Sequence, residues 1–185
     1  RPLPGVIVDV LAERGVRLTI DQASAILIHA DAVRDANRAI NLTRITAWPD
    51  VVERHVIDSL VWLREVQPPA GPMLDLGSGA GYPGVPLGIV LGQPITLCES
   101  VGKKAKFLSS LIGLLPPGSD VFAGRAEDLA KFSPGSYSSV VVRAVSSLPA
   151  LVELAAPLLN AEGRLFALKG TPDSDEVQWG DAAAA

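Results

Sequence analysis

The sequence is poor in cysteine and in aromatic residues, and it contains no long hydrophobic run. Cys98 is the only cysteine among 185 residues, so an internal disulfide and a zinc site built on several thiolates are both excluded. Hydrophobic residues make up 48% of the chain, but no apolar run approaches the roughly 18 residues that a membrane-spanning helix requires. We therefore expect a soluble protein of the reducing cytoplasm, with no metal centre and no membrane contact.

The charge balance argues against a protein that coats nucleic acids. The formal net charge is −4, whereas general RNA or DNA binding depends on clustered Lys and Arg side chains that neutralise phosphates. Any contact with RNA must therefore be local. The basic residues that cluster are Arg34, Arg38, Arg44, Arg54 and His55 in the first third, and Lys103, Lys104 and Lys106 further on. On charge alone, a solvated helix face is the simpler explanation of each cluster.

The first part of the chain shows helical patterns. Thr19 and Gln22 have the spacing of a capping box, and the apolar residues after them recur at helical spacing. This predicts a helix that runs to about Ile40. A further helix is expected after Pro49, because a proline disfavours the α conformation of the residue before it. A proline-rich break then ends this helical extension, which we place at residues 1–70.

Beyond the break, short apolar runs alternate with helical segments, which is the pattern of a parallel sheet. Strands are predicted at Met73–Leu76, Ile95–Cys98, Asp120–Ala123, Ser138–Val142 and Arg164–Leu168. We therefore expect an α/β fold with a Rossmann-like core at residues 71–170. Residues 171–185, which end in alanines, are expected to be an incomplete C-terminal tail.

The stretch LDLGSGAGYPG, from Leu74 to Gly84, lies where the first predicted strand turns into its helix. In a doubly wound sheet, ligands bind at such a turn, outside the carboxyl ends of the strands. Gly77, Gly79 and Gly81 leave the backbone bare and permit positive φ angles, and the first N–H groups of the following helix can face a ligand. A tight turn without a ligand is the alternative.

Two acidic residues flank this loop. Glu99 ends the second predicted strand about twenty residues later, where a carboxylate can accept hydrogen bonds from both hydroxyls of a ribose. The ligand is therefore expected to contain a nucleoside, as dinucleotides and S-adenosylmethionine do. Asp75 would repel the pyrophosphate of a dinucleotide and suits the ammonium or sulfonium end of S-adenosylmethionine. It could equally do no more than accept hydrogen bonds from loop N–H groups.

Two further places on the same edge offer polar groups. Ala126 and Glu127 open a helix after the third predicted strand, with a backbone N–H and a carboxylate that can meet an adenine edge. Glu127 could instead only complement the helix dipole. Arg143 ends the fourth strand and could stack on a base or hold a phosphate, two tasks that suit Arg better than Lys.

An ordered set of motifs makes the sequence resemble one known family. The motifs are NLT (Asn41–Thr43), RHVIDS (Arg54–Ser59), DLGSGAGYPGVPL (Asp75–Leu87), ESVGKKAKFL (Glu99–Leu108), GRAED (Gly124–Asp128), SVVVRAVSSL (Ser139–Leu148) and ALKG (Ala167–Gly170). The set resembles the bacterial 16S rRNA (guanine-N7) methyltransferase G family, also called glucose-inhibited division protein B. The resemblance covers roughly Leu18 to Gly170, and the combination is far more specific than any single motif.

The resemblance implies the sheet of a class I S-adenosylmethionine-dependent methyltransferase with an N-terminal helical extension. It also implies transfer of a methyl group from S-adenosylmethionine to N7 of one guanine in the 16S rRNA of the small ribosomal subunit. With Asp75 and Gly79 of the loop included, the candidate cofactor-binding residues are Asp75, Gly77, Gly79, Tyr82, Glu99, Ala126, Glu127 and Arg143. The candidate RNA-contacting residues are Asn41, Arg54, His55, Ser59 and Lys169, with Asp58 in the same RNA-facing motif. Tyr82 stands where relatives usually carry Leu or Phe.

Guanine N7 has a free lone pair and no proton, so the attack needs no general base and positioning should dominate catalysis. The catalytic candidates are Arg143, His55 and Asp58. We expect His55 to position the reactants or contact RNA, with a buried structural histidine as the alternative. Asp58, or alternatively Asp75, would stabilise the positive charge that develops on guanine.

Two rival functions stay open, and one structural departure is expected. An NAD-dependent oxidoreductase is the rival enzyme, and a regulator that binds S-adenosylmethionine without catalysis is the rival of another class. Relatives continue past the ALKG motif into two more strands, whereas this chain has only its short tail. We expect a monomer.

Overall fold

The computed structural model describes residues 1–143 and 147–168. The helices are α1 (Pro4–Glu13), α2 (Ile20–Ile40), α3 (Trp48–Val51), the π-helix η1 (Val52–Ile57), α4 (Asp58–Leu60), the 3₁₀-helices η2 (Val61–Arg64) and η3 (Ile112–Leu114), α5 (Gly84–Leu91), α6 (Gly102–Ser109), α7 (Ala126–Phe132) and α8 (Leu148–Ala155). The strands are β1 (Met73–Leu76), β2 (Ile95–Cys98), β3 (Asp120–Phe122), β4 (Tyr137–Arg143) and β5 (Leu159–Leu168).

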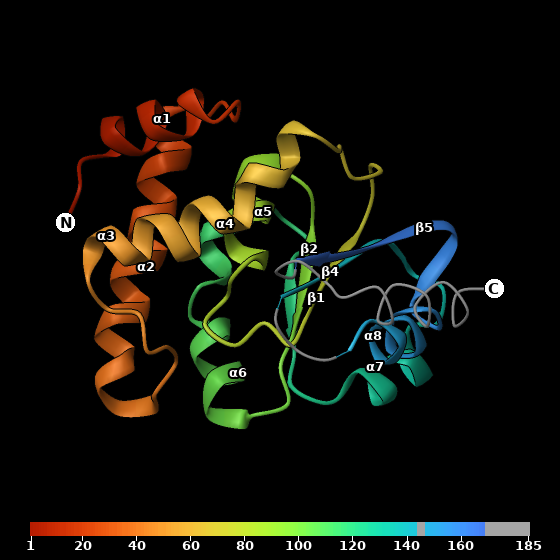
Figure 1. The fold of residues 1–185 in the computed structure, drawn as a ribbon. Coiled ribbons are helices and arrows are strands. Elements are labelled where there is room, and N and C mark those ends of the chain that lie inside the picture. The colour runs from red at the N-terminus through yellow and green to blue at the C-terminus, as the bar shows by residue number, and fades with distance from the viewer. Residues whose placement is uncertain (144–146, 169–185) are drawn as a thin grey trace.

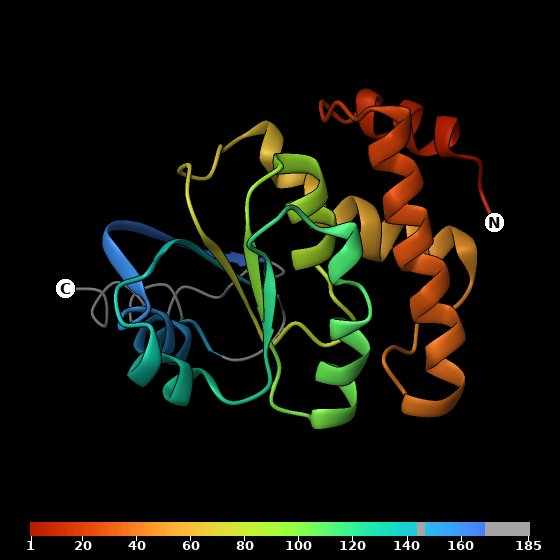
Figure 2. The same cartoon turned by 180° about the vertical axis from the view of Figure 1, so that it is seen from behind.

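A five-stranded sheet in the order β3-β2-β1-β4-β5 forms the centre of the molecule, and every strand pair is parallel. One hydrophobic cluster packs α1, α2, η1, α4, α5 and α6 against one face, and a second packs α7 and α8 against the other (Figures 1 and 2). Covered faces explain why nearly every residue of β1 and β4 is buried. The predicted α/β fold with an N-terminal helical extension is confirmed.

Helix α2 runs alongside the sheet, from the level where the strands begin to the level where they end (Figure 1). It begins as predicted, because the Thr19 side chain accepts a hydrogen bond from Gln22 N at 3.1 Å and Gln22 Oε1 accepts one from Thr19 N at 2.9 Å. It ends at Asn41, which has the left-handed φ of 50°. Its 21 residues span about 30 Å. The C-terminal half of α2 therefore reaches the edge where the strands have their carboxyl ends (Figure 1).

The helical segment begins at Trp48, so the prediction that it starts after Pro49 was wrong. Pro49 is tolerated there because an N–H in the first turn of a helix has no intrahelical partner. The segment also differs from the single regular helix that the sequence predicts. It consists of α3, the π-helix η1, α4 and the 3₁₀-helix η2 in succession. In η1 the N–H of Asp58 donates to the carbonyl of Glu53, five residues back. A π turn places one more residue in each hydrogen-bonded turn than an α turn does. Side-chain periodicity alone does not show where such a turn occurs.

Strand β5 begins at Leu159, five residues before the predicted Arg164. Its register against β4 shifts between Tyr137 and Ser139, and the early residues of β5 are largely polar and exposed, so no apolar run marks them. The predicted tail at 171–185 lies outside the described residues. Within the described part of the chain, no helix is both long and apolar enough to cross a membrane.

Candidate functional site

The glycine loop connects β1 to α5 at the carboxyl edge of the sheet. Gly77, Gly79 and Gly81 have φ angles of 77°, 57° and 91°, which lie in the region that favours glycine. The N–H groups of Gly77 and Ser78 donate to the carbonyl of Cys98 at 2.9 and 3.0 Å. The loop is therefore fixed to the end of β2 by its own backbone.

Gly81 is more crowded than Gly79. A Cβ atom there would lie 2.9 Å from both His29 Nε2 and Val85 Cγ2. At Gly79 the nearest atom to such a Cβ is a carbonyl oxygen of the loop, at 3.8 Å. Packing and the backbone angle both favour glycine at position 81. At position 79 the backbone angle favours it.

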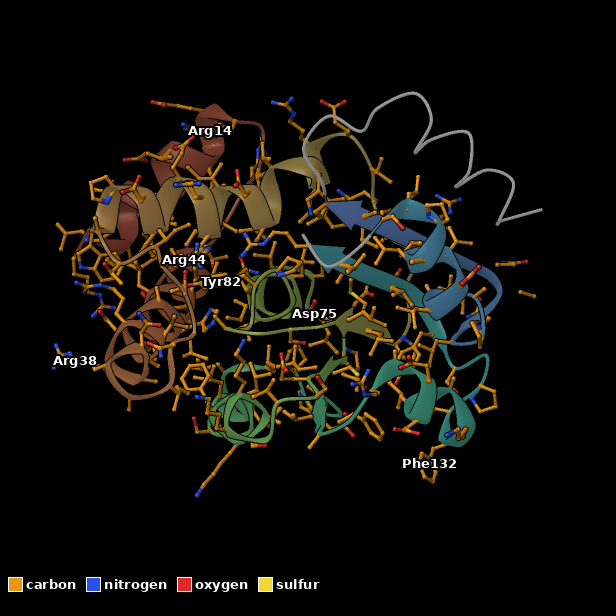
Figure 3. All side chains as sticks on the ribbon, turned by 60° about the horizontal axis from the view of Figure 1, so that its bottom comes forward. Arg14, Arg38, Arg44, Asp75, Tyr82 and Phe132 are labelled. Atoms are coloured by element: carbon orange, nitrogen blue, oxygen red, sulfur yellow. The ribbon has the colours of Figure 1, made fainter. Side chains whose placement is uncertain are left out.

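Asp75 lies at the centre of the molecule, on β1 beside α5 (Figure 3). Its side chain is 1% exposed, and burial raises its pKa to about 7. Asp75 Oδ2 accepts a hydrogen bond from the N–H of Gly84 at 3.0 Å, whereas Oδ1 has no partner among the described residues. Because Oδ2 takes the first N–H of α5, Asp75 already occupies the helix end where a dinucleotide would place its pyrophosphate.

Glu99 is buried at the end of β2, beside the loop. Its Oε2 accepts a hydrogen bond from Gly79 N at 2.9 Å, and its Oε1 accepts one from Val101 N at 2.8 Å. An ionised carboxylate can accept about four hydrogen bonds. Each oxygen of Glu99 can therefore accept one further hydrogen bond, and together they can accept from the two hydroxyls of a ribose.

A cavity of about 170 Å³ opens between the glycine loop and the start of α7, and its lining includes Gly77, Cys98, Ala126 and Glu127. Pockets that enclose a whole drug-sized ligand hold roughly 300 Å³ or more, so this cavity suits one part of a larger ligand. The backbone N–H groups that open a helix have no partner within it. Those of Ala126 and Glu127 can face a base in this cavity.

Arg143 links the end of β4 to η1. Its Nη1 donates to the carbonyl of Arg54 at 3.0 Å, and its Nη2 lies 3.2 Å from Nδ1 of His55. Its guanidinium carbon also lies 5.7 Å from the ring centroid of Tyr82. Arg143 therefore joins the sheet, the glycine loop and the helical extension.

His55 is held as a neutral ring. Burial and the nearby Arg143 charge lower its pKa to about 4. Because Nδ1 accepts from Arg143, the hydrogen-bond network assigns the proton to Nε2, which donates to Thr43 Oγ1 at 2.9 Å. Both ring nitrogens of His55 are thus engaged, so neither is free to remove a proton from a substrate.

Tyr82 lies between two histidine rings. The His55 ring stacks on it with a centroid distance of 4.6 Å and an angle of 10°, and the His29 ring tilts against it at 4.4 Å. His29 is not among the predicted site residues, yet its Nε2 lies 2.8 Å from the Ala80 carbonyl of the loop. Burial lowers the pKa of His29 to about 4, so the neutral ring donates to that carbonyl. A lone histidine within the apolar stripe of α2 was the signal that could have identified it.

The predicted RNA contacts fall in different environments. Asn41, Arg54 and Asp58 are exposed, and Arg54 and Asp58 lie close in the chain to the buried His55. Ser59 has no exposed surface, and its hydroxyl donates to the carbonyl of His55. We therefore do not propose Ser59 as an RNA contact. Lys169 lies outside the described residues.

Comparisons with known proteins identify the family. A model of the family described as "rRNA small subunit methyltransferase G" matches residues 22–185. Proteins named "Ribosomal RNA small subunit methyltransferase G" include one from Geobacter sp. (strain M21), which is 39% identical over 90% of this chain and 77% of its own length. Another, from Symbiobacterium thermophilum, is 35% identical over 97% of this chain and 77% of its own length.

Solved structures share the fold at low sequence identity. An O-methyltransferase from Bacillus cereus in complex with SAH matches with a TM-score of 0.52 and 22% identity, over 71% of this chain and 61% of the other. A putative S-adenosyl-L-methionine-dependent methyltransferase from Methanococcus maripaludis matches with a TM-score of 0.50 and 14% identity, over 83% of this chain and 68% of the other. The motif resemblance, the matching family model and the relatives agree, and the chain belongs to the rRNA small subunit methyltransferase G family.

Proposed function

We propose that this chain transfers a methyl group from S-adenosylmethionine to N7 of a guanine in the 16S rRNA of the small ribosomal subunit. Family membership supports the reaction. The observation that carries the proposal is the left-handed glycine loop between β1 and α5, which lies beside the Glu99 carboxylate and a cavity lined by Ala126 and Glu127. This combination suits a nucleoside-containing methyl donor.

The residues at the carboxyl edge fit S-adenosylmethionine better than a dinucleotide. Glu99 would accept hydrogen bonds from the ribose hydroxyls, and the backbone at Gly77 and Ala126 would contact the nucleoside. Asp75 Oδ1, which is buried and has no hydrogen-bond partner among the described residues, would accept from the ammonium group of the methionine part. The engagement of the α5 N-terminus by Asp75 argues against a pyrophosphate there. Gly79 and Tyr82 would shape the loop around the ligand.

The neutral, fully engaged state of His55 suits a reaction without a general base. The guanine N7 lone pair forms the new carbon–nitrogen bond while the methyl–sulfur bond breaks, and no proton is removed. The residues therefore act by positioning, which can lower a barrier by roughly 7–11 kcal/mol. Arg143 and His55 would hold the reacting groups in place. The exposed Asp58 would stabilise the positive charge on the product base, and Asn41 and Arg54 would contact RNA.

Methyl incorporation tests this proposal directly. Small ribosomal subunits from a strain that lacks this methylation, incubated with the protein and tritium-labelled S-adenosylmethionine, should gain one labelled N7-methylguanine. Binding of S-adenosylmethionine in a calorimeter, without incorporation into subunits or free rRNA, would instead favour a regulator. Preferential binding of NAD would favour an oxidoreductase and contradict the proposal.

The cellular setting follows from the same proposal. Ribosomal subunits are cytoplasmic in bacteria, and the single free cysteine, Cys98, is buried and suits a reducing compartment. We therefore propose a cytoplasmic protein whose macromolecular partner is the small ribosomal subunit. A monomer stays our prediction, and light scattering would check it.

A further inference from the structure

Two basic clusters that are separate in the sequence lie along one edge of the folded chain. Figures 1 and 2 both place the C-terminal end of α2 beside α6, at the edge where the strands have their carboxyl ends. The residues of this basic rim are Arg34, Arg38 and Arg44 at the end of α2 and in the following loop, and Lys103, Lys104 and Lys106 in α6.

A small hydrophobic cluster holds the two halves of the basic rim in place. It contains Val33 of α2, Leu42 of the following loop, and Ala80 and Tyr82 of the glycine loop, and Phe107 of α6 packs against it. The glycine loop is therefore packed between α2 and α6. The ends of α2 and α6 that carry these basic residues therefore both adjoin the glycine loop.

The charge of the basic rim is opposite to that of the whole chain. Residues 34–46 and 102–109 contain six basic side chains and a single acidic one, Asp35, although the chain as a whole has a net charge of −4. On an ordinary solvated helix face, acidic and basic residues alternate and pair. The excess of basic residues makes the basic rim locally positive, although the protein as a whole is acidic.

Four side chains of the rim are exposed, and these are Arg38, Arg44, Lys103 and Lys106. The Arg38 side chain is 84% exposed and lies 3.7 Å from Asp35, and it points away from the body of the molecule (Figure 3). Arg34 lies over the Trp48 ring at 4.6 Å and donates to the Thr46 carbonyl. A cavity of about 240 Å³, lined in part by Arg34, Arg38 and Thr46, opens between them.

We infer that the basic rim binds the RNA backbone on both sides of the guanine to be methylated, with arginines on one flank and lysines on the other. This inference rests on the proposed function. N7 lies on the Hoogsteen edge, which a protein reaches when the base is unstacked. Phosphates held on both flanks would keep the strand open across the glycine loop, as positively charged grooves do with single strands.

Salt-dependent binding of three double variants tests the inference. Arg38→Ala with Arg44→Ala removes charge from one flank, and Lys103→Ala with Lys106→Ala removes it from the other. Each pair should weaken binding to small ribosomal subunits about tenfold in filter binding. Each should also flatten the plot of log affinity against log salt by roughly 0.7–0.9 for every phosphate that the variant no longer neutralises. Affinity for S-adenosylmethionine should not change.

Arg17→Ala with Arg64→Ala is the matched control. Arg17 precedes α2 and lies at the opposite end of that helix from Arg38, and Arg64 packs near Gly15 at that end. This pair removes the same charge from a surface outside the rim and should leave the affinity and the salt slope as in the wild type. Thermal melting of all three variants checks that they fold.

The outcomes separate failure of the inference about the basic rim from failure of the proposed function. If the wild type methylates subunits but the control pair weakens binding as much as the rim pairs do, the rim has no special role and the inference is wrong. If one flank matters and the other does not, the two-sided arrangement is wrong. If the wild type neither binds nor methylates the subunits, the proposed function fails and the inference fails with it.

Discussion

The two sides of the glycine loop are built from different chemical groups. On the side of β2 and α7, the loop is held by backbone N–H groups and carboxylates: Ser78 N donates to the Cys98 carbonyl, and Gly79 N donates to Glu99. On the side of α2 and η1, the loop is held by side-chain rings, because Tyr82 packs between His29 and His55.

This difference predicts how each side responds to mutation. Backbone contacts depend on φ angles and close approach, so the β2 side should tolerate few changes at its glycines. Ring and guanidinium contacts depend on side-chain identity, so the α2 side should respond to loss of individual hydrogen bonds. The four variants below, in order of decreasing expected effect, test this contrast.

Gly81→Ala should have the largest effect, with Gly79→Ala as its matched control. Both positions have a left-handed φ, which costs a non-glycine residue about 1–2 kcal/mol, but only Gly81 is crowded by His29 and Val85. Overpacking should add to the cost at Gly81, giving a loss in unfolding free energy of roughly 2–4 kcal/mol. Urea denaturation measures both values. Equal losses at the two glycines would show that crowding by His29 and Val85 is unimportant.

Asp75→Asn should alter the pH dependence of the unfolding free energy. The difference between variant and wild type should change by a few kcal/mol between pH 4 and pH 8. The folded pKa of Asp75 is raised from 3.8 to about 7 by burial, so its contribution to stability is present below pH 3.8 and is lost as the pH rises through 7. The variant lacks this loss, so its unfolding free energy relative to wild type should rise between pH 4 and pH 8.

The measurement is urea denaturation of both proteins across that range. His29 and His55, whose pKa values are lowered to about 4, lose their stabilising contribution as the pH falls from 6.5 through 4. Their effect is common to both proteins and cancels in the difference. Parallel stability curves would show that Asp75 is ionised in the folded protein throughout.

Arg143→Ala should impair function without preventing folding. It removes the donors to the Arg54 carbonyl and His55 Nδ1, and hydrogen bonds from a charged group contribute about 1.5–3 kcal/mol. We expect kcat/KM for methylation to fall roughly 10- to 100-fold. Arg143→Lys keeps the charge but not the planar fork, so it should recover only part of the activity. Unchanged kinetics in the alanine variant would remove Arg143 from the site.

Thr43→Val should have the smallest effect, about 1 kcal/mol of unfolding free energy. The change leaves Nε2–H of His55 without its acceptor. It also removes the acceptor of Ile45 N in the loop that carries Arg44. Thr43→Ser restores the hydroxyl and should restore stability in urea denaturation. Wild-type stability in the valine variant would show that the Thr43 hydroxyl contributes no net stabilisation.

Much of the fold could be predicted from local patterns. The capping box at Thr19 and the apolar runs of β1 and β2 are encoded in neighbouring residues, so the predicted bounds agree with the structure. The early part of β5 and the π-helix η1 could not be predicted. Strand pairing after a register shift and the insertion of one residue into a helical turn leave no apolar period in the sequence.

The sequence by itself determined which groups are available at the carboxyl edge: a bare glycine loop, the acids Asp75 and Glu99, and the arginine that ends β4. Tertiary structure alone decided which atoms meet. It turned Asp75 toward the N-terminus of α5, buried Ser59, placed His29 against Ala80, and brought the basic residues of α2 and α6 to one rim. The physical reason is that such contacts join elements far apart in the chain, whose relative positions are fixed by packing on the sheet.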